Sequence, residues 1–147
     1  MGSESPGAGL SGNYRVRALR SALSAARRLF PKTADCMELR AQALKLRYWP
    51  AKNPTDDSGV LLDVDWDWIK SLHRENVGEL RIDGTIAGRD NLRLIFFVAG
   101  KQQEGEWPII WILHAAQKKR DGFTSRELLI FRTRKRQVVL DFYGGAA

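Results

Sequence analysis

The sequence has few of the residues on which common catalytic and metal centres depend. It holds one cysteine and two histidines among 147 residues. The single Cys36 excludes an internal disulfide and an all-cysteine zinc site, and it favours a reducing compartment, so we expect a cytoplasmic protein. The chain also lacks a Gly-x-Ser-x-Gly motif and a phosphate-binding glycine loop followed by Lys-Ser/Thr. A triad hydrolase and a nucleotide triphosphatase are therefore disfavoured.

Long apolar runs are also missing. No stretch approaches the ~18 residues that a membrane-spanning helix requires, and residues 1–12 contain no apolar signal-peptide core. Residues 1–12 are rich in Gly and Ser, so we expect a flexible N-terminus followed by a single domain over 13–147. A hydrophobic content of 44%, with five Trp and six Phe, predicts an ordered core for that domain.

Charge is unevenly distributed along the chain. The formal net charge is +7, with residues 1–50 and 91–147 net basic and residues 51–90 net acidic. A strongly basic balance favours a polyanionic partner such as a nucleic acid. Two basic segments thus flank an acidic insert, and the basic segments are where we expect such a partner to bind.

The N-terminal segment has a helical pattern. Apolar residues recur at three- and four-residue steps from Val16 to Phe30, which predicts a helix from Arg15 that ends at Pro31. A second helix is predicted over 34–48. Together they would form a helical hairpin that covers one face of a sheet. The arginines of the first helix either contact RNA or an acidic partner, or form the solvated face of a packed amphipathic helix.

The acidic insert carries alternating carboxylates. We expect a short strand over 60–64 and a short helix over 66–74, capped by Asp65. Asp63, Asp65 and Asp67 are spaced like metal ligands, but the further oxygen ligands and the turn glycine of a calcium loop are missing. We therefore expect these carboxylates to be solvated or to pair with the protein's own cations, and we predict no metal and no other cofactor.

The C-terminal half predicts a sheet followed by a helix. Three apolar or alternating runs read as strands, over 79–83, 91–98 and 109–116, with a polar hairpin loop over 100–106. Thr124 and Glu127 match a capping box for a helix that runs to about Leu140. The predicted fold is α+β: a small, mainly antiparallel sheet of about four strands, an N-terminal helical hairpin and a C-terminal basic helix.

Clustered cations are the strongest chemical signal in this half. They follow or interrupt the predicted strands and continue onto the last helix. The candidates for a catalytic site are Arg81, Arg93, His114, Lys118, Lys119 and Tyr143, and the candidates for further phosphate contacts are Arg120, Arg132, Lys135 and Arg136. A sheet that ends in clustered cations, with a cationic helix behind it, suits a polyanion.

The same residues carry a resemblance to a known family. A Leu-Arg strand is followed by Asn-Leu-Arg-Leu-Ile-Phe-Phe-Val, and a third strand ends in Trp-Ile-Leu-His-Ala-Ala-Gln-Lys-Lys. This order resembles the RelE/ParE toxin superfamily, with the HigB-like and phage-derived branch the most similar, over about Gly78 to Tyr143. The resemblance implies a toxin of a type II toxin–antitoxin system. Such a toxin cleaves mRNA, often on the ribosome, and a cognate antitoxin protein holds it inactive.

Metal-free RNA cleavage sets requirements that these side chains can meet. The 2′-hydroxyl must lose its proton, the phosphorane must be stabilised and the leaving oxygen must be protonated. Arg81 and Arg93 would clamp a phosphate through their rigid guanidinium forks. Lys118 and Lys119 would bind backbone phosphate or transfer a proton, and His114 is a natural acid or base because histidine titrates near neutrality. A C-terminal aromatic, Tyr143, would stack on a base or assist proton transfer.

Each candidate also has a structural alternative. Arg81 can be a surface residue paired with its neighbours Glu79 or Asp83, and Arg93 can form a salt bridge to the acidic insert. His114 can be a hydrogen-bonded core histidine, the two lysines a solvated strand end, and Tyr143 a packing residue. At the level of function the alternatives are a ParE-like poison of DNA gyrase that cleaves nothing, and a non-catalytic basic module that binds nucleic acid.

Overall fold

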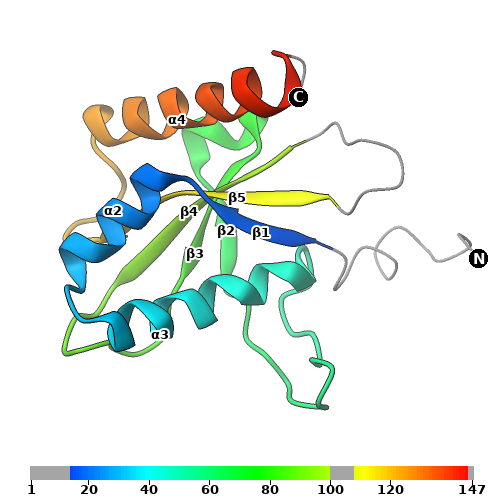
Figure 1. Ribbon diagram of the computed structural model, residues 1–147, viewed down its shortest axis with the longest axis vertical. Coiled ribbons are helices and arrows are strands. Elements are labelled where there is room, and N and C mark those ends of the chain that lie inside the picture. Colours follow the sequence, from blue (N-terminus) through cyan, green and yellow to red (C-terminus); the bar gives the residue numbers. More distant parts are fainter. Residues whose placement is uncertain (1–13, 100–107, 146–147) are drawn as a thin grey trace, which may run out of the picture.

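A five-stranded mixed sheet forms the centre of the computed structural model, which describes residues 14–99 and 108–145 (Figure 1). The strands lie in the spatial order β1-β5-β4-β3-β2. Their bounds are β1 Arg15–Ala18, β2 Trp66–Trp68, β3 Val77–Arg81, β4 Leu92–Val98 and β5 Ile109–Gln117. Strand β1 pairs in parallel with β5, and the remaining neighbours are antiparallel.

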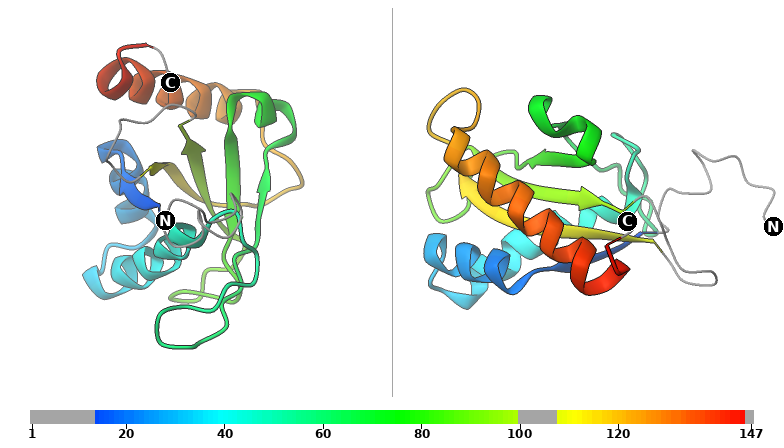
Figure 2. Two further views of the ribbon diagram at one scale, coloured as in Figure 1. Left: turned by 90° about the vertical axis from the view of Figure 1, so that its right-hand side faces the viewer. Right: turned by 90° about the horizontal axis from the view of Figure 1, so that it is seen from above.

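Helices cover both faces of this sheet. The α-helices are α2 Arg20–Leu29, α3 Thr33–Ala43 and α4 Ser125–Tyr143, and the 3₁₀ helices are η1 Leu44–Tyr48 and η2 Lys70–Glu75. Figure 2 shows α4 lying across the strands on one side, with α2 and α3 on the opposite side. The predicted α+β fold is confirmed, with a helical hairpin on one face and a C-terminal helix on the other. The sheet has one strand more than expected and one parallel pair.

Strand β4 divides its side chains between two apolar cores. Leu94 and Phe96 are buried among residues of the α2–α3 side, whereas Ile95 and Phe97 are buried among residues of the α4 side. Successive side chains of a strand point to opposite faces, so a continuous apolar run is what a strand covered on both faces requires. The sequence Leu-Ile-Phe-Phe therefore identifies β4 as a central strand.

The prediction of a helix from Arg15 was wrong for its first five residues. Residues 15–18 form β1, and Arg15 to Ala18 align with Ile109 to Ile112 of β5. Helix α2 begins only at Arg20. The periodic positions at 16 and 19 fit a helix by spacing alone, but the pairing with a strand far away in the sequence determines the local conformation.

The acidic insert also differs from its prediction. Residues 60–64 form no strand, although Thr55 and Leu61 form an isolated bridge. The predicted helix over 66–74 is instead strand β2 followed by the 3₁₀ helix η2. Aromatic packing explains β2, because Trp66 and Trp68 contact each other at 5.1 Å between ring centroids and both contact Trp49 and Phe96. The two tryptophans therefore belong to the core on the α2–α3 side.

The second and last helices fit their predictions closely. The α-helical part of the second ends at Ala43 and continues as η1 to Tyr48. Helix α4 begins with the expected capping box, in which Glu127 N donates to Thr124 Oγ1 at 3.1 Å and Thr124 N donates to Glu127 Oε1 at 2.8 Å. Its C-terminus lies at Tyr143, three residues beyond the prediction, followed by Gly144 in the left-handed conformation.

Two expectations concern residues that the structure does not describe. They are the flexible N-terminus over 1–12 and the hairpin loop over 100–106. In the described part of the chain, no helix has both the length and the apolar composition needed to cross a membrane.

Candidate functional site

The strand register gathers several predicted residues on the α4 face of the sheet. Arg81 of β3 is aligned with Arg93 of β4, and Arg93 is aligned with Ala116 of β5. Two residues away along each strand, Glu79 of β3 is aligned with Ile95 of β4, and Ile95 is aligned with His114 of β5. Aligned residues of neighbouring strands, and residues two apart on one strand, share a face. The register therefore places Arg81, Arg93 and His114 on one face of the sheet.

Glu79 lies at the centre of this cluster. Its carboxylate accepts a hydrogen bond from Arg93 Nε at 3.0 Å, and Lys118 Nζ lies 4.0 Å from the same oxygen. The Glu79 residue is 6% exposed, and the side chains of Arg93 and Lys118 are 14% and 18% exposed. A carboxylate shielded from water needs such partners to offset its lost hydration. We call these three residues the Glu79 triad.

Further contacts fix the two cations of the triad. Arg93 Nη1 also donates to the carbonyl of Leu92 at 3.2 Å. The Lys118 ammonium lies 4.8 Å from the centroid of the Phe123 ring, a cation–π geometry. The Lys118 backbone N–H donates to Asn91 O at 2.8 Å, which extends the pairing of β5 and β4 by one step. Both cations are thus held in place before any ligand arrives.

Arg81 has its own carboxylate partner at the edge of the cluster. Its Nη1 donates to Asp65 Oδ1 at 3.2 Å, and the two side chains are 37% and 48% exposed. Arg93 thus forms a salt bridge to the acidic insert, as its structural alternative states, whereas Arg81 pairs with Asp65 instead of Glu79 or Asp83. Asp65 and Glu79 both belong to the acidic insert.

Lys119 and Arg120 continue the cationic run beyond the triad. Both are exposed, and within the described residues neither forms an ion pair. Beside the enclosed Glu79 triad, the strand end therefore offers two cations that are free to meet a phosphate chain.

His114 lies on the same face but beneath α4. Its Nδ1 lies 2.7 Å from Arg134 Nη1, which also donates to Leu113 O at 2.9 Å. A guanidinium only donates, so Nδ1 must be the acceptor and the ring proton is on Nε2. Burial, the charge of Arg134 and that of Arg28 lower the pKa of His114 from 6.5 to about 4, against an opposing effect of Glu127. The ring is therefore neutral at pH 7, which contradicts the expectation that it titrates near neutrality.

Tyr143 does not belong to the cluster. Its hydroxyl accepts a hydrogen bond from Trp111 Nε1 at 3.1 Å, near the start of β5. Lys118 follows the other end of that strand, about 20 Å away at the usual rise per residue. The expected return of Tyr143 to the cationic site was thus wrong, because α4 runs across the sheet and places its C-terminus over the opposite end of β5 (Figure 1).

The basic residues of α4 differ in their contacts. Arg132 Nε and Lys135 Nζ lie 2.9 Å and 3.8 Å from the carboxylate oxygens of Glu75 in η2. Lys135 also lies 5.7 Å from the Phe97 ring centroid. Both side chains therefore join α4 to η2. Arg136, in contrast, is exposed and forms no ion pair among the described residues.

Three contributors to this site were not predicted from the sequence. Glu79 was read only as a possible neighbour of Arg81, although a glutamate alternating with apolar residues in a strand can be recognised as a buried charge. Phe123 gave no signal, since its contact with Lys118 depends on the turn between β5 and α4. Arg134 was not among the candidates, because its contact with β5 depends on how α4 packs on the sheet.

The carboxylates of the insert do not gather as metal ligands. Asp65 pairs with Arg81, and Asp67 Oδ1 accepts from Trp68 N at 2.9 Å. Over residues 14–99 and 108–145, no three side chains of His, Cys, Asp or Glu are grouped so that they could hold an ion.

Comparison of the chain with protein-family models, with curated proteins and with solved structures finds no match. The function must therefore be argued from the residues and their geometry.

Proposed function

We propose that this chain is the toxin of a type II toxin–antitoxin system of the RelE/ParE superfamily, of the HigB-like type, and that it cleaves mRNA without a metal. The observation that carries the proposal is the convergence of Arg93 and Lys118 on one partly enclosed site at the end of β5. Lys119 and Arg120 lie just beyond it and are exposed. Two pre-positioned cations with a carboxylate between them form a site able to stabilise a phosphorane and accept a proton.

The geometry suggests a division of roles. Arg93 and Lys118 would exchange part of their contact with Glu79 for the scissile phosphate and stabilise the charge that develops there. Glu79 would then accept the proton of the 2′-hydroxyl, because His114 Nδ1 is occupied by Arg134. As the bond from phosphorus to the 5′-oxygen breaks, Lys118 would donate a proton to that leaving oxygen. Lys119 and Arg120 would bind phosphates on either side, with Arg136 and Arg81 as more distant contacts. A cognate antitoxin protein and mRNA, on or off the ribosome, are the partners that this function implies.

One observation favours a second candidate, a basic module that binds nucleic acid without cleaving it. Glu79 already neutralises part of the charge of Arg93 and Lys118. If that ion pair is purely structural, only the exposed cations remain for binding. Affinity would then fall steeply with salt, and single substitutions would weaken it gradually.

Growth arrest on controlled expression in a bacterium tests the proposal. Arg93→Ala and Lys118→Ala should each relieve the arrest, because removal of either cation leaves the phosphorane without a fixed donor; losses of about 10²–10³-fold in cleavage are typical of such donors. Glu79→Gln should also relieve it, although Gln can still accept from Arg93, since the amide cannot take a proton.

Matched controls separate this result from misfolding. Lys70→Ala removes an exposed cation of η2 and should leave the arrest unchanged. Circular dichroism should show that each variant is folded. Full toxicity of both Arg93→Ala and Lys118→Ala would contradict the proposed site, and arrest with a DNA-damage response and intact transcripts would point to gyrase instead.

A further inference from the structure

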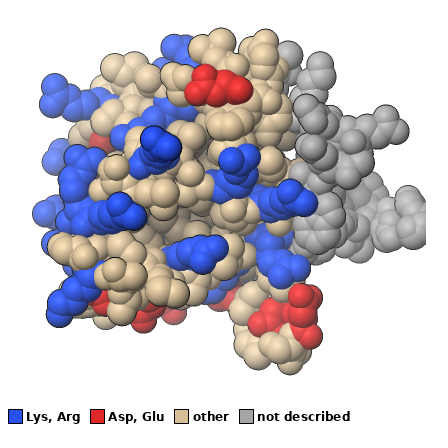
Figure 3. Space-filling view, in the orientation of Figure 1, with Lys and Arg blue, Asp and Glu red and all other residues tan. Residues whose placement is uncertain are grey.

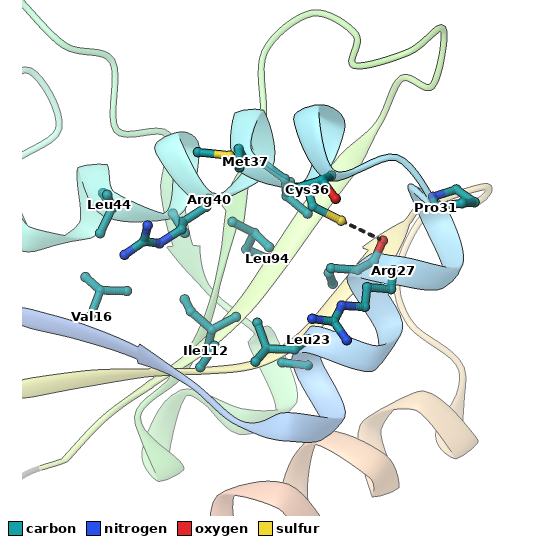
Figure 4. Close-up of a pocket in the computed structure, with 17 residues that line it drawn as sticks. Val16, Leu23, Arg27, Pro31, Cys36, Met37, Arg40, Leu44, Leu94 and Ile112 are labelled. Atoms are coloured by element: carbon teal, nitrogen blue, oxygen red, sulfur yellow. Dashed lines mark hydrogen bonds between the residues drawn. The ribbon is translucent and has the colours of Figure 1, made fainter.

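A groove opens between α2 and α3 on the sheet face opposite the Glu79 triad. It encloses about 470 Å³, with Leu94, Ile112 and Ala115 contributed by the sheet strands. Cys36 of α3 also lines it (Figure 4). Its Sγ lies 3.0 Å from the carbonyl oxygen of Phe30. Such a hollow has the size and the apolar lining of a binding site for several side chains.

Large apolar side chains surround the groove and remain in contact with water. Leu23 of α2 is 49% exposed, and Met37 and Leu44 at and beyond α3 are 61% and 42% exposed. Exposed apolar residues are ordinary when they are scattered, but a contiguous group around a hollow marks a surface that binds something. Methionine at such a place adapts to different apolar partners.

The groove is also lined by unpaired positive charge. Arg27 extends over it from α2 and Arg40 from α3 (Figure 4). Both are exposed, and neither forms an ion pair within the described part of the chain. Figure 3 shows Lys and Arg gathered over this side of the molecule. Arg27 and Arg40 differ in this respect from the cations of the Glu79 triad, which are already paired with a carboxylate.

From these features we infer that the groove binds an acidic amphipathic helix of a partner protein. Helix α3, with its 11 residues, is about 16 Å long, which matches about three turns of a bound helix. Apolar side chains of that helix at i, i+3, i+4 and i+7 would cover Leu23, Met37 and Leu44. Its acidic side chains would meet Arg27 and Arg40, and this charge complementarity sets the orientation and the rate of association.

Other occupants satisfy only part of the surface. A nucleic acid would contact Arg27 and Arg40 through its phosphates. It would leave the aliphatic side chains that line most of the groove exposed to water. A flat membrane surface would not enter a hollow between two helices. The inference does not depend on RNA cleavage, since the groove and the Glu79 triad lie on opposite faces of the sheet.

Two synthetic helical peptides test the inference. One has Leu on a single face and Glu elsewhere, and the other has Lys in place of every Glu. Fluorescence anisotropy should show that the Leu/Glu peptide binds the full chain and that the Leu/Lys peptide does not. Arg27→Glu/Arg40→Glu and Met37→Asp should each weaken binding by about tenfold or more. The control Lys70→Glu/Arg74→Glu, on η2, should bind as the wild type does.

Amide chemical shifts should change in α2 and α3 when the Leu/Glu peptide is added. Equal binding of both peptides, no binding, or shifts confined to another surface would overturn the inference. So would displacement of the peptide by an RNA oligonucleotide or by anionic vesicles, or a dimer in sedimentation that Met37→Asp dissociates. Arg27→Glu/Arg40→Glu should keep any growth arrest, so failure here and failure of the proposed function are distinguishable.

Discussion

Glu79 and His114 show how neighbouring residues on one sheet face can have opposite electrostatic surroundings. Glu79 has two cations beside it, so its charge is stabilised despite low exposure. His114 has Arg134 against Nδ1 and the charge of Arg28 nearby, so its protonated form is disfavoured. Only the histidine is thereby turned into a neutral hydrogen-bonding group with its proton on Nε2.

The lowered pKa of His114 makes a prediction about stability. The unfolded chain binds a proton at this residue below its ordinary pKa of 6.5, whereas the folded chain does so only near pH 4. The free energy of unfolding should therefore fall as pH decreases from about 6.5 to about 4, and His114 should contribute no pH dependence above that window. Because the ring is partly exposed, we expect a loss of about 1 kcal/mol at pH 5.

His114→Gln isolates this contribution. Gln can still accept from Arg134 but does not titrate, so Arg28, Arg134 and Glu127 keep their surroundings. Urea unfolding at pH 5 and pH 7.5 should show a smaller acid destabilisation in the variant than in the wild type. An equal acid destabilisation in both proteins would show that His114 is protonated alike in the folded and unfolded states.

At the scale of elements, sequence reasoning succeeded where the local pattern and the tertiary environment agree. Strands β4 and β5 are apolar runs of strand length, and Thr124 with Glu127 forms the capping box that the spacing predicts. Strand β1 was missed because its partner on β5 is about 90 residues away in the sequence. Strand β2 was missed because its tryptophans are set by contacts with Trp49 and Phe96.

In the candidate site, too, the sequence revealed the local features and missed those that depend on contacts between distant segments. Arg81, Arg93, Lys118 and Lys119 were found because cations next to strands are visible in the sequence. The individual carboxylates that pair with Arg81 and Arg93 were not identified, because both contacts depend on strand pairing. Glu79 reaches Arg93 through the register of β3 and β4, and Asp65, the residue before β2, reaches Arg81 at the end of β3. Tyr143 was misplaced because the direction in which α4 crosses the sheet is not encoded in its own periodicity.

Gly78 provides a test of the packing of β2, β3 and β4. A Cβ added at this position would lie 2.7 Å from Phe96 Cζ and 2.9 Å from the backbone oxygen of Asp67. One of these is backbone, so the sheet itself would have to move. Gly78→Ala should therefore lower the free energy of unfolding by about 1–3 kcal/mol. Urea unfolding followed by tryptophan fluorescence measures this, and unchanged stability would contradict the described contact of β3 with Phe96 and β2.

At the scale of the whole molecule, the net charge of +7 is divided between two kinds of surface. On the α4 face, the Glu79 triad holds its cations in place and leaves Lys119 and Arg120 exposed. On the α2–α3 face, unpaired arginines surround an apolar groove. We propose that the first surface acts on RNA and that the second binds an acidic protein segment, so one small domain would have an active face and a partner face.

The mapping of transcript 5′ ends after controlled expression in a bacterium tests the central proposal most directly. Expression of the wild-type chain should create new 5′ ends within translated messages, and the Lys118→Ala/Lys119→Ala variant should create none. The Arg27→Glu/Arg40→Glu variant, altered on the opposite face, should produce the same ends as the wild type. Intact transcripts with the wild-type chain, or identical cleavage by the Lys118→Ala/Lys119→Ala variant, would contradict the assignment of RNA cleavage to the strand-end cluster.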